Sequence, residues 1–326
     1  MISFLHIGER LVGAGAPCFL IAEIGSNHNQ DLDQAYRLID AAVAAGVDAG
    51  KFQSFRAADH YSKRTPKFGY LGGLDTYKLI ESLELERSWH QPLKAYTESA
   101  GLVFLSSPCD RDAVAELAEL GMCAFKVASF DLPDLQLIRQ IAETGKPLIL
   151  STGMADWMDI QRALDEARKA GNEQLALLQC TSLYPAPVAL SNLRAIDVMR
   201  EAFSVVTGYS DHTEGDHVCI AAVARGAAII EKHFTLDRSM PGPDHQFAIE
   251  PRELTAMVRR IRDVEAALGD GAKAGPRAEE LEMFEKGRRS LHAACSISQG
   301  EVISTSMLAI KRPGYGIPPY LVDKVI

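Results

Sequence analysis

Short runs of apolar residues alternate along most of the chain with longer segments whose apolar residues recur at helical spacing. The segments "DQAYRLIDAAVAAG" (33–46) and "DIQRALDEARKAG" (159–171) show this spacing, and each closes in the glycine that commonly follows a helix. The apolar runs are too short for helices and are typical of buried strands. We predict strands at residues 19–24, 49–53, 102–106, 124–128, 147–151, 175–180, 204–208 and 227–232.

The order of these elements predicts the fold class. Eight strands that alternate with helices over about 250 residues favour a (β/α)8 TIM barrel, in the α/β class. A doubly wound open sheet is the alternative, but such sheets usually carry a glycine-rich fingerprint after the first strand. The sequence at that point is "AEIGSNHNQ" (22–30), which does not match GxGxxG.

The composition changes after the last helical segment of the predicted barrel. We predict a TIM-barrel domain at 1–270, a linker at 271–287 and a small module at 288–326, where small apolar and polar residues alternate between Gly/Pro turns. The module is short, so we expect a partial β-rich fold. Within the barrel, the connection at 56–87 is longer than an ordinary barrel loop, and we expect it to flank the mouth of the barrel.

Composition and charge exclude several function classes. The 326 residues carry a formal net charge of −9 without a basic stripe, so we expect no nucleic-acid partner. No window reaches the run of about 18 apolar residues that a membrane span needs, and the N-terminus lacks the pattern of a signal peptide. The six cysteines are scattered without a CxxC pair, which predicts reduced thiols in a cytoplasmic protein.

Polar residues follow every predicted strand at its carboxyl end. In a barrel these ends share one face, and the active site lies there. Polar groups at the ends of all the strands indicate a functional site rather than a random distribution. The residues are Glu23, Asn27, His28, Lys51, Gln53, Ser106, Ser107, Lys126, Ser129, Asp131, Ser151, Thr152, Gln179, Thr181, Ser182, Tyr184, Asp211, His212, Glu231, Lys232, His233 and Asp244.

Lysines and hydroxyl groups within this set suit a phosphorylated anion. Lysine offers a point charge to phosphate, and hydroxyl groups add hydrogen-bond donors. A single serine at a strand end is more often a cap than a ligand, but several such groups at one face favour an anion site. They are Lys51, Lys126, Ser107, Ser129, Ser151 and Ser182.

A second subset is typical of a metal site. His212 and His233 end neighbouring strands, so both rings could bind one ion, and the carboxylates of Glu231 and Asp244 are nearby in the sequence. Imidazole and carboxylate together suit Mn²⁺, Zn²⁺ or Fe²⁺. A lone histidine is usually structural, whereas two at adjacent strand ends favour a metal. Neither subset names a reaction, because many barrels bind both phosphate and metal.

Other functions stay open on these residues alone. One is a metal-dependent hydrolase or aldolase on a TIM barrel, although zinc hydrolases commonly carry an HxH pair on the first strand, where this chain has His28 alone. A Schiff-base aldolase would need a desolvated lysine, for which Lys126 or Lys232 could serve. A non-catalytic sugar-binding or assembly protein is a further alternative, and the full set of polar strand ends argues against it.

The strand-end motifs resemble those of the N-acetylneuraminate (sialic acid) synthase family, which includes legionaminic and pseudaminic acid synthases and spore coat polysaccharide proteins. The resemblance covers nearly the whole chain. The motifs are "AEIGSNHN", "KFQ", "FLSSP", "KVASFD", "KPLILSTGMA", "LLQCTSLYPAP", "GYSDHTEG", "EKHFTLDRSMPGPDH" and "KRPGYG".

The resemblance implies a reaction and an architecture. Phosphoenolpyruvate would condense with an N-acetylated amino sugar, such as N-acetylmannosamine, its 6-phosphate or a diacetamido sugar, to give a nine-carbon 2-keto acid and phosphate. The barrel would be joined to an antifreeze-like domain and paired in a domain-swapped homodimer. The segment "PGPDHQFAIEP" (241–251) favours the sialic or legionaminic types over the pseudaminic type.

The resemblance also implies roles for individual residues. His212 and His233 match ligands of a divalent metal, most commonly Mn²⁺, and Arg312 matches an arginine that the partner's small domain supplies. Asp131 stands where some members have Glu, which shortens the reach of that carboxylate by one methylene. We expect Glu23, Asp131, Lys51 and Gln53 to be catalytic and the following residues to bind substrate: Lys126, Ser107, Ser129, Ser151, Ser182, Tyr184, Asp244 and Arg312.

Overall fold

The computed structural model describes residues 4–69 and 73–326, and the chain divides into two compact units after Leu268. The first unit is built around an eight-stranded parallel sheet in the order β5-β4-β3-β10-β9-β8-β7-β6. The strands are β3 (Phe19–Gly25), β4 (Ala49–Ser54), β5 (Val103–Pro108), β6 (Phe125–Val127), β7 (Leu148–Ser151), β8 (Leu175–Cys180), β9 (Val206–Asp211) and β10 (Ile229–His233).

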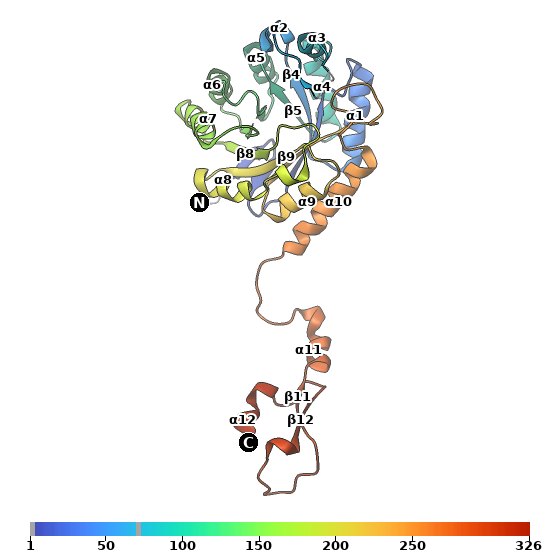
Figure 1. Ribbon diagram of the computed structural model, residues 1–326, viewed down its shortest axis with the longest axis vertical. Coiled ribbons are helices and arrows are strands. Elements are labelled where there is room, and N and C mark those ends of the chain that lie inside the picture. The colour runs from blue at the N-terminus through green and yellow to red at the C-terminus, as the bar shows by residue number, and fades with distance from the viewer. Residues whose placement is uncertain (1–3, 70–72) are drawn as a thin grey trace. The chain divides into compact units, whose positions relative to one another are not determined.

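The two ends of this strand order meet. β5 and β6 are in contact, so the sheet curls into a nearly closed barrel with helices around it (Figure 1). The predicted (β/α)8 TIM barrel is therefore confirmed. The main helices are α1 (Leu32–Ala45), α4 (His90–Ser99), α5 (Arg111–Glu119), α6 (Leu135–Glu143), α7 (Trp157–Lys169), α8 (Arg194–Phe203), α9 (His217–Ala224) and α10 (Pro251–Leu268).

Aspartate side chains set where several of these helices begin. Asp31, Asp110, Asp134 and Asp156 each accept hydrogen bonds from backbone N–H groups in the first turn of α1, α5, α6 and α7. Such a cap is worth about 1 kcal/mol, because it satisfies donors that have no partner inside the helix. The loops that end at these caps leave the carboxyl ends of the strands, so the caps also fix where the strand-end residues lie.

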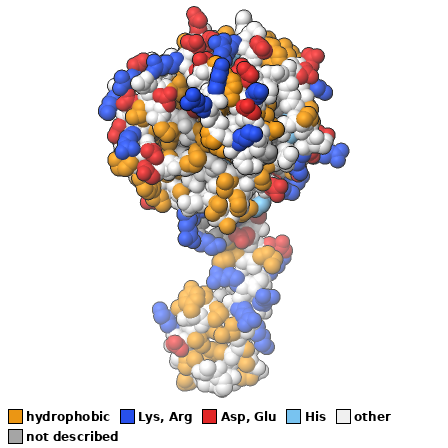
Figure 2. Space-filling model, turned by 45° about the horizontal axis from the view of Figure 1, so that its top comes forward, with side chains coloured by type: hydrophobic (Ala, Val, Ile, Leu, Met, Phe, Trp, Pro, Cys, Tyr) orange, Lys and Arg blue, Asp and Glu red, His pale blue; other side chains and the backbone are white. Residues whose placement is uncertain are grey.

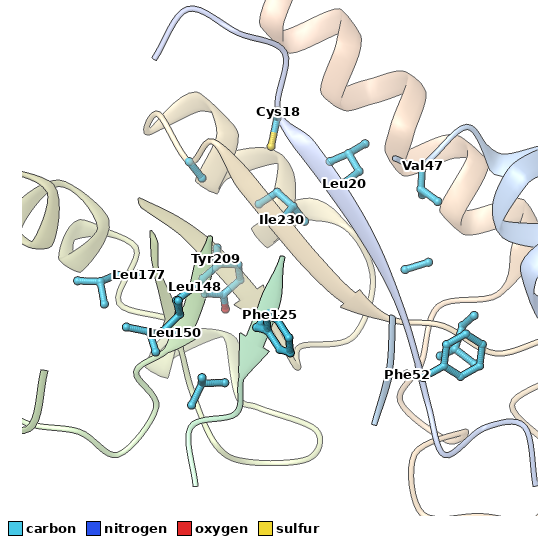
Figure 3. Close-up of a cluster of buried hydrophobic side chains, with 14 of the residues drawn as sticks. Cys18, Leu20, Val47, Phe52, Phe125, Leu148, Leu150, Leu177, Tyr209 and Ile230 are labelled. Carbon is cyan, nitrogen blue, oxygen red and sulfur yellow. The ribbon is translucent and has the colours of Figure 1, made fainter. Parts of the chain in front are cut away.

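Side-chain alternation along each strand separates two apolar clusters. In β3, Leu20, Ala22 and Ile24 belong to the larger cluster between the strands and the helices, whereas Phe19 and Ile21 belong to a smaller cluster inside the barrel. Every second residue of a strand therefore faces the interior of the barrel. Figure 3 shows members of the larger cluster, including Leu20, Val47, Phe52, Phe125, Leu148, Leu177, Tyr209 and Ile230.

An N-terminal hairpin, which the sequence pattern did not predict, covers the amino-terminal end of the barrel. β1 (Phe4–Ile7) and β2 (Arg10–Gly13) pair antiparallel around Gly8, whose φ of 59° suits glycine. Leu5, Ile7 and Val12 are buried in the interior cluster with residues from the starts of the barrel strands. Apolar side chains thus fill this end of the barrel, and the carboxyl end is left for polar groups.

The long connection after β4 contains short helices. They are α2 (Ala57–His60), α3 (Thr76–Glu81) and the 3-10 turn η2 (Arg87–Trp89). Residues 70–72 of the predicted 56–87 connection lie outside the described residues.

No helix in the described part of the chain is long and apolar enough to cross a membrane.

The second unit, Gly269–Ile326, is small and mixed. β11 (Ser290–Ala293) pairs antiparallel with β12 (Leu308–Lys311), which agrees with the predicted β-rich character. α11 (Leu281–Gly287) lies within the segment expected to be a linker, and α12 (Val322–Val325) lies at the C-terminal end.

Charge is mixed over the surface of the first unit. Figure 2 shows Lys/Arg and Asp/Glu side chains interspersed on the visible face of the barrel. A nucleic-acid interface is usually marked by a stripe of one sign.

Gly208 in β9 occupies a position with no room for a side chain. A Cβ added there would lie 2.3 Å from the carbonyl oxygen of Ile229 and 2.7 Å from Leu178 Cδ2. We expect Gly208→Ala to lower the free energy of unfolding by about 1–3 kcal/mol, the usual cost of overpacking, as measured by urea unfolding. Gly50→Ala in β4 is the matched control, because the nearest atom to its Cβ would be 3.6 Å away. Equal stability of the two variants would contradict the prediction.

Candidate active site

The interior positions at the carboxyl ends of the strands hold most of the predicted site residues. Six of the eight strands continue from an apolar interior residue to a polar one two positions later, on the same face. The steps are Ile21 to Glu23, Ala49 to Lys51, Leu105 to Ser107, Ala124 to Lys126, Ile149 to Ser151 and Ile229 to Glu231. The barrel therefore places these polar side chains together above a fully apolar layer.

Two lysines and two glutamates form a buried charge cluster at this level. Lys51 Nζ lies 2.7 Å from Glu23 Oε2 and 3.8 Å from Glu231 Oε2, and Lys126 Nζ lies 3.5 Å from Glu231 Oε1. Each of the four side chains is less than 5% exposed. Because the charges balance within the cluster, the barrel can bury them, and each one depends on its neighbours.

Burial and pairing shift the pKa values of these four groups in different directions. Burial raises the pKa of Glu23 to about 7, against the opposing effect of Lys51. Burial lowers the pKa of Lys126, although Glu231 acts against it. For Lys51 and Glu231 the effect of burial is outweighed by their oppositely charged partners, so the pKa of Lys51 is raised and that of Glu231 is lowered. Glu23 is the member of the cluster best placed to exchange a proton near neutral pH.

Hydroxyl groups of four predicted serines lie at the same carboxyl ends of the strands as the two lysines. Ser107 Oγ accepts a hydrogen bond of 3.1 Å from Lys51 Nζ, and Ser129 Oγ accepts one of 3.1 Å from the backbone N–H of Gly153. The side-chain oxygens of Ser151 and Ser182 are buried and find no hydrogen-bond partner within the described residues. Buried polar atoms without partners are uncommon, and these two are available to a ligand.

The two predicted metal ligands lie next to each other. The ring centroids of His212 and His233 are 5.3 Å apart, and the ring of Tyr184 is 4.2 Å from that of His212. His212 Nδ1 lies 2.7 Å from the carbonyl oxygen of Thr181. A carbonyl oxygen can only accept, so His212 carries its proton on Nδ1 and its Nε2 lone pair is free.

The surroundings of His233 also suit a metal ligand. His233 Nδ1 is buried without a hydrogen-bond partner among the described residues, and Asp244 Oδ2 lies 3.8 Å from it. Burial lowers the pKa of both histidines, which favours the neutral rings that metals bind. Burial raises the pKa of Asp244 to about 6. Two neutral imidazoles with a neighbouring carboxyl group fit a divalent transition metal.

Two residues lie elsewhere than the sequence suggested. Glu231, grouped with the histidines because it is two positions before His233, contacts Lys126, Lys51 and Ser210 instead. Lys232 faces the helix layer, where its Nζ lies 2.7 Å from Asp211 Oδ2 in a fully buried ion pair. Lys232 is thus not part of the charge cluster, and Lys126 is the better candidate for a Schiff-base lysine.

Asp131 belongs to a separate group that sequence reasoning missed. His60, Cys109 and Asp131 offer ligand atoms that all lie within 4.8 Å of one another, and His60 Nδ1 is 3.8 Å from Asp131 Oδ1. Neither His60 nor Cys109 was predicted, because one lies in the long connection and the other just beyond β5. Their position shortly after the ends of β4 and β5 was the signal that could have revealed them.

One cavity joins these groups. Gln53 lies on its wall and donates a 2.6 Å hydrogen bond from Nε2 to Glu23 Oε1. The polar lining includes the predicted residues Gln53, Ser107, Asp131, Tyr184, His233 and Asp244, and the apolar lining includes Phe55, Leu79, Ile80, Leu83 and Phe130. Arg312 follows β12 in the second unit, so the barrel itself does not supply it.

Removing one carboxylate tests whether the charged side chains of the cluster depend on one another for stability. Glu231→Gln leaves Lys126 without its nearest anion, so we expect the free energy of unfolding to fall by about 3 kcal/mol in urea. The double variant Glu231→Gln/Lys126→Met should recover part of this loss, because the unpaired cation is also removed. An unchanged stability of the single variant would show that the cluster does not depend on this pair.

Comparison with known proteins identifies a family and named relatives. The model of the NeuB family matches residues 38–273. The chain is 41% identical over 305 residues to N,N'-diacetyllegionaminic acid synthase of Campylobacter jejuni, covering 91% of each chain. It is 36% identical over 307 residues to human N-acetylneuraminate-9-phosphate synthase, covering 93% of this chain and 85% of that protein.

A solved structure is similar over most of the chain. It is the N-acetylneuraminic acid (sialic acid) synthetase of Leptospira borgpetersenii, which is 33% identical, with a TM-score of 0.79 over 87% of this chain and 96% of that one. By their names, these relatives are synthases of N,N'-diacetyllegionaminic acid, N-acetylneuraminate 9-phosphate and N-acetylneuraminic acid. With its barrel, its buried strand-end residues and these matches along most of its length, the chain belongs to the NeuB family.

Proposed function

We propose that this protein condenses phosphoenolpyruvate with an N-acetylated amino sugar, giving a nine-carbon 2-keto sugar acid and phosphate. The observation that carries the proposal is the buried cluster of Lys51, Lys126, Glu23 and Glu231 beside the paired histidines in one barrel mouth. The similarity to sialic and legionaminic acid synthases supports it.

The lysines and hydroxyls would bind phosphoenolpyruvate. Lys51 and Lys126 provide the positive charge for its carboxylate and phosphate, and Ser129, Ser151 and Ser182 provide hydroxyl groups close to them. The free oxygens of Ser151 and Ser182 would gain the partners that they lack within the described residues. Tyr184, which packs against His212, would bound the same pocket. Binding in one orientation lowers the entropic part of the activation barrier.

His212 and His233 would hold a divalent metal; imidazole and carboxylate suit Mn²⁺, Zn²⁺ or Fe²⁺, and the family resemblance implies Mn²⁺. The bound metal would supply Lewis-acid polarisation to the aldehyde of the sugar. The hydrogen bond from His212 Nδ1 to Thr181 fixes the ring so that Nε2 is the ligand. Asp244, next to His233, would contact the sugar or the metal-bound groups.

The carboxylates would manage charge and protons during the reaction. The enol carbon attacks the carbonyl carbon of the sugar, and positive charge develops on the carbon that carries the phosphate. Glu23, held by Gln53 and Lys51, would stabilise that charge, and Asp131 would act from the opposite side of the cavity. A pKa of about 7 allows Glu23 to take a proton from the water that adds to this carbon before phosphate leaves.

The cavity wall bears on the choice of sugar. Leu79, Ile80, Leu83 and Phe130 are apolar members of the lining, and the described lining contains no lysine or arginine. A 6-phosphate would find no cation there, whereas acetamido methyl groups and a deoxy carbon would find apolar contacts. We therefore propose a diacetamido, legionaminic-type sugar ahead of N-acetylmannosamine, with N-acetylmannosamine 6-phosphate disfavoured.

The assembly is part of the proposal. The protein would act in the cytoplasm as a domain-swapped homodimer, with Arg312 of each second unit reaching the barrel of the partner. Arg312 follows β12, and a buried arginine–anion contact would add charge that the barrel lining lacks.

Chelation tests the metal. Thorough treatment with EDTA should abolish phosphate release from phosphoenolpyruvate, and added Mn²⁺ should restore it, because the metal polarises the aldehyde. His233→Ala should stay folded, lose bound metal and turn over at least about 100-fold more slowly, a loss of about 3 kcal/mol in transition-state stabilisation. Turnover that survives chelation would reject the metal role.

Borohydride separates the proposal from an aldolase that uses Lys126. The proposed reaction forms no imine, so borohydride added during turnover should leave Lys126 unmodified in a mass spectrum. A reduced adduct on Lys126 would favour the aldolase.

A panel of acceptor sugars tests specificity. Phosphate release should have a higher kcat/KM with the diacetamido sugar than with N-acetylmannosamine, and should be lowest with the 6-phosphate. Leu83→Ser should narrow the difference between the first two sugars by weakening the apolar wall. Fastest turnover with the 6-phosphate would contradict the assignment of this wall.

Complementation tests whether Arg312 acts on the partner. Arg312→Ala and His233→Ala should each be nearly inactive alone. In mixed dimers the barrel of the first variant can receive Arg312 from the second, so activity should reappear. If Arg312 acted on its own barrel, mixing would restore nothing, and mixing two preparations of the same variant is the matched control.

A further inference from the structure

His60, Cys109 and Asp131 form a compact group that the proposed reaction does not explain. His60 ends α2 after β4, Cys109 follows β5, and Asp131 follows β6. Their ligand atoms lie within 4.8 Å of one another, and no other set of three or more His, Cys, Asp or Glu residues in 4–69 and 73–326 meets this limit. The group is distinct from the neighbouring rings of His212 and His233, although His233 lines the same cavity as the three residues.

We propose that His60, Cys109 and Asp131 form a second cation site, selective for a thiophilic divalent ion such as Zn²⁺. Imidazole, thiolate and carboxylate are the three ligand types that zinc takes in proteins, at about 2.0–2.3 Å, which places ligand atoms about 3.3–3.8 Å apart. A contraction of about 1 Å would bring the present group to that spacing. Three protein ligands leave a fourth position open to the cavity.

Asp131 connects the other two side chains. Its Oδ1 lies 3.8 Å from His60 Nδ1, and its carboxyl group acts on the Cys109 thiol, which donates a 3.7 Å hydrogen bond to the carbonyl oxygen of Ser107. The His60 ring stacks on Phe55 at 6.5 Å and meets Tyr61 edge-on at 4.8 Å, so its orientation is fixed from both sides. Contacts that are already present without a cation therefore hold the three side chains near one another.

The thiol of Cys109 is a weak nucleophile in the metal-free protein. Burial, followed by the charge of Asp131, raises the pKa of Cys109 well above its usual value, so the sulfur keeps its proton. A bound cation would replace that proton: the S–H bond breaks, the sulfur–metal bond forms, and the proton passes to solvent. A soft ion gains most from this exchange, which is the basis of the selectivity for zinc over Mn²⁺.

Occupancy of this site would have a consequence for the reaction. Asp131 is expected to contact the sugar or the reacting carbons, so a cation on Asp131 would exclude that contact. This consequence rests on the proposed function, but binding of the cation does not. The test therefore measures binding directly.

Cobalt is the probe, because Co²⁺ bound to a thiolate absorbs strongly in the near ultraviolet and Co²⁺ bound only to histidines does not. We expect Co²⁺ added to chelator-treated full-length protein to produce this absorption at one equivalent per chain, and Zn²⁺ to bleach it. Cys109→Ser should abolish the band, and His60→Ala should weaken binding at least tenfold. The double variant His212→Ala/His233→Ala should keep the band.

Cys180→Ser is the matched control. Cys180 Sγ lies 3.8 Å from His212 Nδ1, so a thiolate band that came from the histidine pair would disappear in this variant. Loss of the band in Cys180→Ser, its survival in Cys109→Ser, or its absence in the unmodified protein would each overturn the proposal.

Alkylation gives a second measurement that needs no variant. Zn²⁺ should slow the reaction of iodoacetamide with Cys109, mapped by mass spectrometry. The exposed Cys295 in the second unit should react at the same rate with and without zinc. Equal rates at Cys109 in both conditions would overturn the proposal even if Cys109→Ser failed to fold.

Discussion

The alternation of side chains along parallel strands is the constraint on which the site depends. In a closed barrel, every second residue must face an interior that is too narrow for water-filled space. Here the amino-terminal half of that interior is filled by residues such as Ile21, Ile149 and Leu178, with the hairpin residues Leu5 and Val12 beneath them. Only the last interior position or two of each strand can be polar, and these positions converge on one mouth. The charge cluster, the histidine pair and the cavity all follow from this restriction.

Charge balance decides how those converging residues can be buried together. Lys51 and Lys126 at 2% exposure would be too costly to bury alone, and Glu23 and Glu231 lie within 4 Å of them. The balance is uneven, because Glu231 stays ionised between the two lysines while burial raises the pKa of Glu23 to about 7. An arriving anion would compete with these carboxylates for the lysines, and Glu23 is the carboxylate that can yield by accepting a proton. The same cluster thus stabilises the empty site and remains responsive to a ligand.

Much of this could be predicted from the sequence, because apolar runs and strand-end polar residues are local signals. The barrel strands were found at or within a few residues of their observed positions, and the two histidines were correctly expected to be neighbours. β9 was predicted to end at residue 208 but ends at Asp211, since "YSD" has the polarity of a loop. In the fold, Tyr209 packs against the helices and Ser210 bonds to Glu231, so polarity alone could not mark them as strand.

The sequence could not show how deep in the barrel each side chain lies or which distant segments it contacts. Glu231 and His233 share the interior face, but Glu231 sits one step lower, at the level of the lysines, and therefore contacts Lys126 instead of the histidines. The N-terminal hairpin has strands of four residues, too short for a periodic signal. His60 and Cys109 meet Asp131 only because three successive loops converge. Apart from the hairpin, each of these misses concerns a contact between segments far apart in the chain.

The outward-facing neighbours of the histidines show how the fold holds the two predicted metal ligands in register. Asp211 and Lys232 are directly paired across β9 and β10, and their side chains form a 2.7 Å ion pair in the helix layer. The next residue on each strand is a histidine that points the other way. A slip of β10 by one residue would break this pair, leave an unpaired charge in an apolar layer and turn His233 away from His212. The ion pair on the outside of the sheet therefore penalises every arrangement except the one that brings the two imidazoles together inside the barrel.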